Sequence, residues 1–307
     1  MTGDVLVLRA LGIGDLLVAV PALRGLRRAF PDRRIALAAP AWLADLVPLT
    51  GSVGRLVPTP RLGSLTWSDP GPSVAVNLHG AGPESTADLA ATGPGRLLAH
   101  RHDAFPWLDG PEWHEDTHER VRWCRLLEWY GIPADPADLA LERPAVASVA
   151  PGAVVVHPGA SVPPRRWPAD RFAEVAAKLA AAGHRVVVTG SGEERELASA
   201  VAAGAGLPDG AVLAGRLGLA ELAALVADAA LVVSGDTGAG HLATAYGTPS
   251  VLLFGPTPPD RWGPPDGPHA VLWAGVLGDP FGDTVHEGLL ALTPADALAA
   301  AGRVTRG

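Results

Sequence analysis

Two acidic residues stand just after apolar, strand-like runs, and each has the chemistry for a step of group transfer. One is Asp236, in the turn SGDTGAGH at residues 234–241, between apolar runs at 231–233 and 249–254. A helix that starts in such a turn leaves backbone N–H groups free to bind a phosphate, and glycine lets the backbone come close to it. The negative Asp236 suits sugar hydroxyls better than phosphate. The alternative is that Asp236 or Thr237 only caps a structural helix.

The other is Asp15, which follows the strand-like run 5–8 through the turn 10–15. Open α/β sheets bind ligands at the carboxyl ends of their strands, and a carboxylate there can accept a proton as a general base. The turn has Gly12 and Gly14 but lacks the third glycine of a dinucleotide fingerprint, so we do not expect it to bind a dinucleotide. The alternative is that Asp15 merely caps the following helix.

Further polar residues follow strand-like runs in the second half of the chain, at 157–161 and 190–194. If these strands are parallel, the groups gather along one edge of a sheet together with the turn that contains Asp236. Guanidinium groups bind phosphate bidentately and stay charged, which suits Arg165 and Arg166 to a diphosphate. A carboxylate after a strand, such as Glu194, suits the two hydroxyls of a ribose.

A short histidine motif is a candidate metal site, because His114 and His118 match the zinc pattern His-Glu-x-x-His. That pattern works only inside a helix, where both imidazoles lie on one face. Here a Gly-Pro pair precedes it, and Asp116 with Glu119 resembles a helix start, so we predict a helix over 117–130 that leaves His114 outside. We therefore expect no metal there, and we keep His118 as a candidate for the acceptor side.

The elements that must position these groups alternate between strands and helices in both halves. This alternation predicts an α/β fold with doubly wound parallel sheets. A stretch rich in Ala, Pro and Val, 135–151, looks like a linker, so we expect domains over 1–150 and 151–307. The last predicted helix, 293–301, is the one element that we allow to pack back on the N-terminal domain.

Composition narrows the function classes. The net charge is −8, which argues against a nucleic-acid-binding protein, and the single cysteine excludes an internal disulfide framework. No run of 18 apolar residues and no charged-then-apolar leader is visible, so we expect a cytoplasmic protein. A local group of arginines is either a solvated helix face or a contact with an anionic acceptor or with the inner face of the membrane. It comprises Arg24, Arg27, Arg28, Arg33 and Arg34.

Four segments together carry a family resemblance: GIGDLLVAVPAL (12–23), HPGASVPPRRWP (157–168), GSGEERELA (190–198) and the stretch 234–264. They resemble glycosyltransferase family 9, the heptosyltransferase-like enzymes of lipopolysaccharide core assembly. The resemblance implies a GT-B fold, in which two Rossmann-like domains face a central cleft. It implies a nucleotide-sugar on the C-terminal domain, a glycan or lipid-linked acceptor on the N-terminal one, and inverting, metal-independent transfer with no cofactor. Consistently, the sequence contains no Asp-x-Asp.

The resemblance also assigns roles. Asp15 matches the proposed general base, and Arg165 stands where heptosyltransferases have a phosphate-binding lysine, which keeps the charge but changes its shape. Asp236 matches the residue that contacts the donor sugar. The remaining donor-side candidates are Glu194 near the ribose, Leu217 near the base, Thr237, Gly238 and His241 at the diphosphate, and Ser161 and Arg166; the acceptor-side candidates are Gly14, Asn77, His79 and His118.

The resemblance names a donor class and leaves the sugar open. ADP-heptose is the leading donor by analogy, and GDP- or UDP-sugars remain alternatives. A sugar-nucleotide epimerase of the same architecture would need no acceptor, and a non-catalytic nucleotide-sugar-binding protein would lose the base. The presence of Asp15 favours an enzyme. An oxidoreductase would need the fuller glycine fingerprint that is missing.

Overall fold

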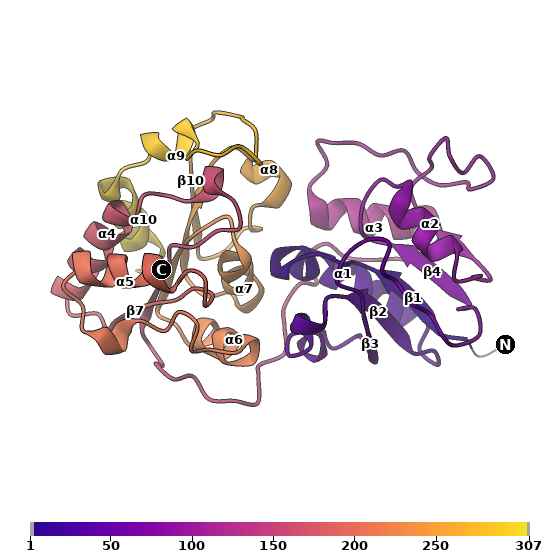
Figure 1. Ribbon diagram of the computed structural model, residues 1–307, viewed down its shortest axis with the longest axis horizontal. Helices are drawn as coiled ribbons and strands as arrows, with labels where there is room; N and C mark the ends of the chain where they lie inside the picture. The colour runs from indigo at the N-terminus through magenta and orange to yellow at the C-terminus, as the bar shows by residue number, and fades with distance from the viewer. Residues whose placement is uncertain (1–2, 306–307) are drawn as a thin grey trace. The chain divides into compact units, whose positions relative to one another are not determined.

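A computed structural model describes residues 3–305 of the chain (Figure 1). The chain divides between Glu142 and Arg143 into two compact units, each with its own parallel sheet flanked by helices. The division falls before the predicted boundary at residue 150. Arg143 belongs with the second unit because its guanidinium binds the carboxylate of Asp228, at 2.6 Å, in that unit.

The first unit has a five-stranded sheet in the order β3-β2-β1-β4-β5, with every neighbouring pair parallel. Strands β1 and β2 are completely buried, as expected for apolar runs covered on both faces. The elements are β1 (Val5–Leu8), α1 (Ile13–Ala29), β2 (Ile35–Ala39), η1 (Ala41–Leu43), η2 (Pro48–Thr50), β3 (Arg55–Pro58), β4 (Val74–Asn77), α2 (Glu84–Ala90), β5 (Leu97–Leu98) and α3 (Glu119–Trp129).

The second unit repeats the plan with the order β10-β9-β8-β6-β7, again all parallel. A single parallel bridge from Val188 to Val212 adds the trace of a further strand beside β7. The elements are β6 (Val154–His157), η3 (Pro163–Arg165), α4 (Ala169–Ala181), β7 (Val186–Val188), α5 (Arg195–Gly204), η4 (Asp209–Ala211), α6 (Leu219–Ala227), β8 (Leu231–Gly235), α7 (Gly238–Tyr246), β9 (Ser250–Phe254), α8 (Pro259–Trp262), β10 (His269–Trp273), α9 (Glu287–Ala291) and α10 (Pro294–Val304).

The last helix, α10, has its partners in its own unit. It packs against α4, β9 and β10, and its buried residues are Ala297, Ala300 and Ala301. The small residues let the helix come close to the sheet. This apolar face is therefore used within the second unit.

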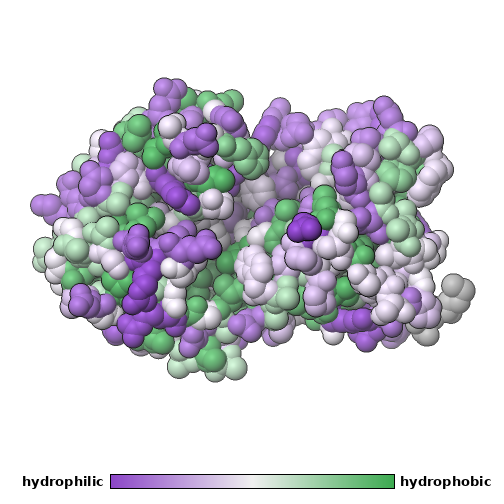
Figure 2. Space-filling view, in the orientation of Figure 1, coloured by the Kyte–Doolittle hydropathy of each residue, from purple (hydrophilic) through white to green (hydrophobic). Residues whose placement is uncertain are grey.

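The two parallel sheets with helices on their faces confirm the predicted α/β fold class. Within residues 3–305, no helix combines the length and the apolar character needed to cross a bilayer. The face drawn in Figure 2 mixes hydrophilic and hydrophobic residues on each unit.

Candidate functional site

Each sheet has one point at which the strand order reverses direction, between β1 and β4 in the first unit and between β6 and β8 in the second. The loops at such a point separate to opposite faces of the sheet and leave a crevice at the carboxyl ends of the strands, where open α/β sheets bind ligands. Asp15 follows β1 in the first unit, and Asp236 follows β8 in the second.

In the second unit, β8 leads through Asp236 and the extended Thr237 into α7. The Thr237 hydroxyl bonds the hydroxyl of Ser234 at 2.7 Å, and no side chain caps the helix. The first N–H groups of α7 are thus free to bind an anion. Gly240 is required by packing, because a Cβ there would lie 2.9 Å from the side chain of Leu252.

Three polar side chains meet at this turn. One carboxylate oxygen of Asp236 lies 3.6 Å from Nη1 of Arg165, and the other lies 3.6 Å from Nε2 of His241. The Asp236 side chain is only 6% exposed, and within the described chain Nε of Arg165 is buried without a hydrogen-bond partner. The groups are close enough to attract one another, and the exposed part of the Arg165 side chain, 26% of its surface, remains open to a ligand.

Glu194 lies beyond the carboxyl end of β7, which is separated from β8 by β6, and just before α5. Its carboxylate accepts a hydrogen bond from the backbone N–H of Ser191 at 2.7 Å and lies against Gly159. A Cβ at position 159 would come 2.1 Å from Oε1 of Glu194, so only glycine allows the carboxylate to sit there. Burial lowers the pKa of nearby His157, Glu194 opposes that shift, and Nδ1 of His157 lies 3.0 Å from the hydroxyl of Thr189.

The remaining donor-side candidates are more loosely associated with this cluster. Arg166 is exposed and donates a hydrogen bond from Nε to the carbonyl of Ala160 at 2.9 Å, which fixes its stem beside the loop after β6. Ser161 is exposed and Leu217 is half-buried. The structure therefore brings Arg165, Asp236 and His241 together at the start of α7, and it does not show Ser161 or Leu217 in contact with them.

In the first unit, Asp15 lies in the first turn of α1. One of its oxygens accepts a hydrogen bond from the backbone N–H of Gly12 at 3.2 Å, and the other pairs with Nη2 of Arg9 at 3.0 Å. The capping role that the sequence left open is therefore real, and it holds the carboxylate in one orientation. Because the side chain is 28% exposed, it remains within reach of a substrate.

Arg9 is a functional candidate that sequence reasoning missed. It directly follows β1, is 1% exposed, and donates hydrogen bonds from Nε to the carbonyl of Asp15 at 2.8 Å and from Nη1 to the carbonyl of Leu78. Nη2 also lies 3.7 Å from the carboxylate of Glu119, and the guanidinium lies over the ring of Trp123. Burial lowers the pKa of Arg9, and the two carboxylates oppose that shift. The sequence signal that could have indicated Arg9 is a charged residue at the end of a fully apolar strand.

The acceptor-side candidates differ in what they can offer. Asn77 is completely buried, and its amide donates to the hydroxyls of Ser85 and Thr86 at 2.9 and 3.1 Å. Its oxygen accepts from the backbone N–H of His79 at 2.9 Å. Contrary to the prediction, Asn77 thus orders the loop after β4 and has no surface to present to a ligand.

His79 and Gly14 remain near the base. Nδ1 of His79 accepts a hydrogen bond from the backbone N–H of Ala10 at 3.2 Å, and burial together with Arg9 lowers the pKa of His79. A neutral imidazole at this position suits a sugar hydroxyl. Gly14 lies in the first turn of α1 beside Asp15.

The histidine motif lies at the start of α3. His118 caps the helix by accepting a hydrogen bond from the backbone N–H of Arg120 at 3.1 Å, and His114 lies outside the helix as predicted. Among residues 3–305, no group of three or more His, Cys, Asp or Glu side chains is arranged to hold a metal ion.

The side chains of the arginine group on and after α1 bind other residues of the first unit. Arg24 and Arg28 both pair with Asp138, at 2.5 and 2.6 Å, and Arg34 pairs with Asp4 at 2.7 Å. Arg33 donates to the hydroxyl of Ser73, and Arg27 donates to the carbonyl of Phe30. Across the described residues, only two carboxylates, Asp138 and Asp4, pair with the group, so these contacts orient the arginines and leave the group with a net positive charge.

Comparisons with known proteins point to one family of enzymes. Residues 131–276 match the sequence profile of the family described as glycosyltransferase family 9 (heptosyltransferase). A lipopolysaccharide heptosyltransferase 1 from Pseudomonas aeruginosa is 39% identical over 153 residues, which cover 48% of this chain and 42% of that relative. A lipopolysaccharide heptosyltransferase 2 from Salmonella typhimurium is 26% identical over 299 residues, which cover 83% of this chain and 84% of that relative.

A solved structure extends the likeness to the whole fold. The E. coli ADP-heptose lipopolysaccharide heptosyltransferase II superposes with a TM-score of 0.78 at 22% sequence identity, over 99% of this chain and 98% of that one. The two-sheet architecture of the predicted GT-B class is thereby confirmed.

Proposed function

We propose that the chain belongs to glycosyltransferase family 9 and that it transfers a heptose or related sugar from a nucleoside diphosphate sugar to a hydroxyl of a cell-surface glycan. ADP-heptose is the proposed donor, because the E. coli neighbour is named for it. The observation that carries the proposal is the cluster of Arg165, Asp236 and His241 at the uncapped start of α7.

The second unit offers each part of such a donor a suitable partner. The free N–H groups at the start of α7 and the cationic Arg165 attract the diphosphate. The carboxylate of Asp236 accepts hydrogen bonds from hydroxyls of the donor sugar, and that of Glu194 accepts them from the ribose. His241 is placed to donate to an oxygen of the leaving diphosphate. One positioned donor of this kind contributes roughly 3 kcal/mol to the stability of a transition state.

Asp15 supplies the proposed base for direct displacement. The oxygen of the acceptor hydroxyl forms a bond to the anomeric carbon, and the hydroxyl proton passes to the Asp15 carboxylate. The bond between the anomeric carbon and the phosphate oxygen breaks, and its electron pair leaves with the nucleoside diphosphate. Because attack comes from the face opposite the leaving group, the anomeric configuration inverts.

We further propose that transfer needs no divalent metal. The charge that develops on the leaving diphosphate can be met by Arg165, His241 and the helix start, which together replace the usual cation. Retention of full activity in EDTA is the expected result. Activity that disappears in EDTA and returns with one divalent cation contradicts this part of the proposal.

Titration calorimetry of the whole chain with ADP, GDP and UDP, in EDTA, tests the donor site. We expect ADP to bind most tightly. Asp236→Ala should bind ADP nearly as the wild type does and should lose affinity for ADP-heptose, because the carboxylate faces the sugar and not the nucleotide. Glu194→Gln is the matched variant, since it should weaken both ligands through the ribose.

Two results would overturn the donor assignment. Failure of all three nucleotides to bind removes the diphosphate site, and equal loss of ADP and ADP-heptose affinity in Asp236→Ala removes the sugar contact. Release of free ADP from ADP-heptose only when an acceptor is added supports transfer, whereas conversion of the sugar without an acceptor indicates an epimerase.

A further inference from the structure

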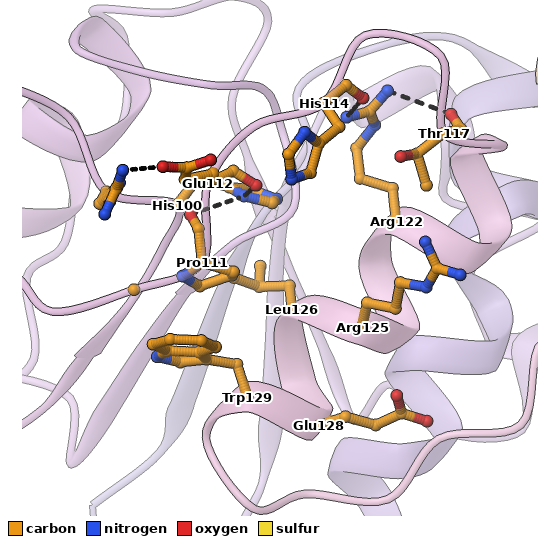
Figure 3. Close-up of a pocket in the computed structure, with 12 residues that line it drawn as sticks. His100, Pro111, Glu112, His114, Thr117, Arg122, Arg125, Leu126, Glu128 and Trp129 are labelled. Carbon is orange, nitrogen blue, oxygen red and sulfur yellow. Dashed lines mark hydrogen bonds and ion pairs between the residues drawn. The ribbon is translucent and has the colours of Figure 1, made fainter.

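A cavity of about 590 Å³ lies in the first unit between the loop at residues 100–117 and helix α3 (Figure 3). This volume is within the range of pockets that bind small organic ligands. None of the roles assigned above uses it. Its lining residues are His100, Arg101, Gly110, Pro111, Glu112, His114, Thr117, Arg122, Arg125, Leu126, Glu128 and Trp129.

The α3 side of the cavity combines an aromatic surface with charged groups. Trp129 leaves 55% of its surface exposed, although large aromatic side chains are usually covered. Arg125 and Glu128 project from the same helix (Figure 3), and Arg125 is exposed with no hydrogen bond or ion pair in the described chain. The flat ring of Trp129 can stack on a sugar ring, and the carboxylate of Glu128 can accept hydrogen bonds from sugar hydroxyls. The unpaired guanidinium of Arg125 can bind a negative group on the same sugar.

The loop side is already paired and can serve as a fixed wall. Arg101 pairs with Glu112, and His100 has Nδ1 3.2 Å from the carbonyls of Pro111 and Glu112. Nε2 of His100, which is 4% exposed, is buried without a hydrogen-bond partner in the described chain. The structure thus leaves one polar atom in the cavity wall unsatisfied, which is uncommon for a buried group.

A chain of alternating charges joins this cavity to the base. Arg122 lines the cavity, is held by the carbonyls of His114 and Thr117 (Figure 3), and donates from Nε to Glu119 at 2.9 Å. Glu119 faces Arg9 at 3.7 Å, and Arg9 holds Asp15 at 3.0 Å. Glu119 therefore is the one side chain in this series between Arg122 in the cavity wall and Arg9, the partner of the proposed base.

We propose that this cavity binds a sugar unit of the acceptor glycan that bears a carboxylate or phosphate, adjoining the unit whose hydroxyl is attacked. Trp129 stacks on the sugar ring, Arg125 pairs with its anionic group, and Glu128 accepts hydrogen bonds from its hydroxyls. The statement that this sugar belongs to an acceptor rests on the proposed function. The binding of an anionic sugar at this cavity can be tested without it.

The test is saturation-transfer difference NMR, which detects weak ligands, on the whole chain with three probes: glucose 6-phosphate, glucuronate and glucose. The variants are Trp129→Ala and Arg125→Gln. Trp42→Ala is the matched control for the first, because Trp42 is also 55% exposed in the first unit and does not line the cavity. Arg185→Gln, at an exposed arginine of the second unit, is the control for the second.

We expect both anionic sugars, or the one whose group fits, to give signals that Trp129→Ala abolishes and Trp42→Ala preserves. Arg125→Gln should weaken the anionic probe by about tenfold, to the level of glucose, and Arg185→Gln should not. Equal signals from all three probes, no signal from any, or signals that survive Trp129→Ala overturn the inference.

ADP calorimetry on the same samples separates this inference from the proposed function. Trp129→Ala and Arg125→Gln should bind ADP as the wild type does, because the donor cluster lies in the other unit. If the wild type binds the anionic sugars but not ADP, the proposed function fails and the sugar site stands. If it binds ADP and no sugar, the reverse holds.

Discussion

The reversal points of the two sheets hold the same chemical pair, an aspartate beside an arginine, under opposite constraints. In the first unit, Asp15 and Arg9 lie 3.0 Å apart, and further hydrogen bonds tie both to the backbone. In the second, Nη1 of Arg165 lies 3.6 Å from the carboxylate of Asp236, and the Arg165 side chain is 26% exposed, whereas that of Arg9 is 1% exposed. The first pair is complete without a ligand, whereas the second retains bonding capacity.

The difference fits the roles proposed for the two pairs, general base in the first unit and donor binding in the second. A general base must present one lone pair to one proton, so its orientation is best fixed in advance. A donor site must receive a charged diphosphate and release it after transfer, so its groups should be satisfied fully only by the ligand. Burying Arg9 costs desolvation energy, and the two carboxylates and two carbonyls around it offset that cost.

Asp15→Asn should have the largest effect, because it removes the base and keeps the cap. The asparagine oxygen can still accept from the N–H of Gly12, so the fold should remain. Loss of a general base lowers kcat by about 10²- to 10⁴-fold, and ADP affinity should not change. The measurement is acceptor-dependent ADP release from ADP-heptose, with calorimetry of ADP as the control. Turnover within a few-fold of the wild type would show that Asp15 is not the base.

Arg9→Met should come next and should act on folding as well as on turnover. It leaves Glu119 and Asp15 without their shared cation in a buried setting, and breaking such a pair costs roughly 3 kcal/mol. Urea unfolding should report the loss of stability, and kcat should fall because Asp15 is no longer held in place.

Arg9→Lys separates the two effects. It keeps the charge but cannot reach Leu78, Asp15 and Glu119 together, so it should recover part of the stability and little of kcat. If Arg9→Lys recovers stability and kcat equally, Arg9 contributes its charge alone. The Asp15–Arg9 pair is then not held in a fixed geometry, and it does not differ in this respect from the Asp236–Arg165 pair.

The donor half of this comparison was readable from the sequence, because its signals are local. The turn at 234–241 carries its glycines, its carboxylate and its helix start within one segment. Arg165 was predicted as a donor-site residue because a guanidinium binds phosphate. Arg9 was missed because its role depends on Glu119, which arrives from α3 far along the chain. Asn77 was misassigned for the same reason, since Ser85 and Thr86 claim its amide.

The cavity could not have been predicted either. It exists because the irregular loop at 100–117 passes over one face of α3, and nothing in the apolar period of that helix reveals what covers it. The strands were easier, because β1 and β8 are short apolar runs buried on both faces. Local patterns thus predicted the sheets and the donor turn, and contacts between distant segments determined the rest.

A smaller effect concerns His100 in the cavity wall. Burial lowers the pKa of His100 from 6.5 to about 4. Between these values the unfolded chain binds the proton and the folded chain does not, so the stability present above pH 6.5 is lost as the pH falls toward 4. The loss between pH 7 and pH 5 is about 2 kcal/mol. His100→Gln should flatten the pH dependence of the urea midpoint over this window, and an unchanged slope would contradict it.

Arg165→Lys should have the smallest effect, and it tests the open half of the comparison. Because Arg165 has one long contact with Asp236 and an unpartnered Nε, its replacement should leave the urea midpoint almost unchanged. A lysine keeps the charge but loses the planar fork, so ADP affinity should fall by about tenfold, or ~1.4 kcal/mol. Arg165→Gln, which also removes the charge, should lower it further while the fold stays stable. If instead Arg165→Lys destabilises the fold as much as Arg9→Lys does, the second pair is as structural as the first, and the free bonding capacity attributed to it is not there for a ligand.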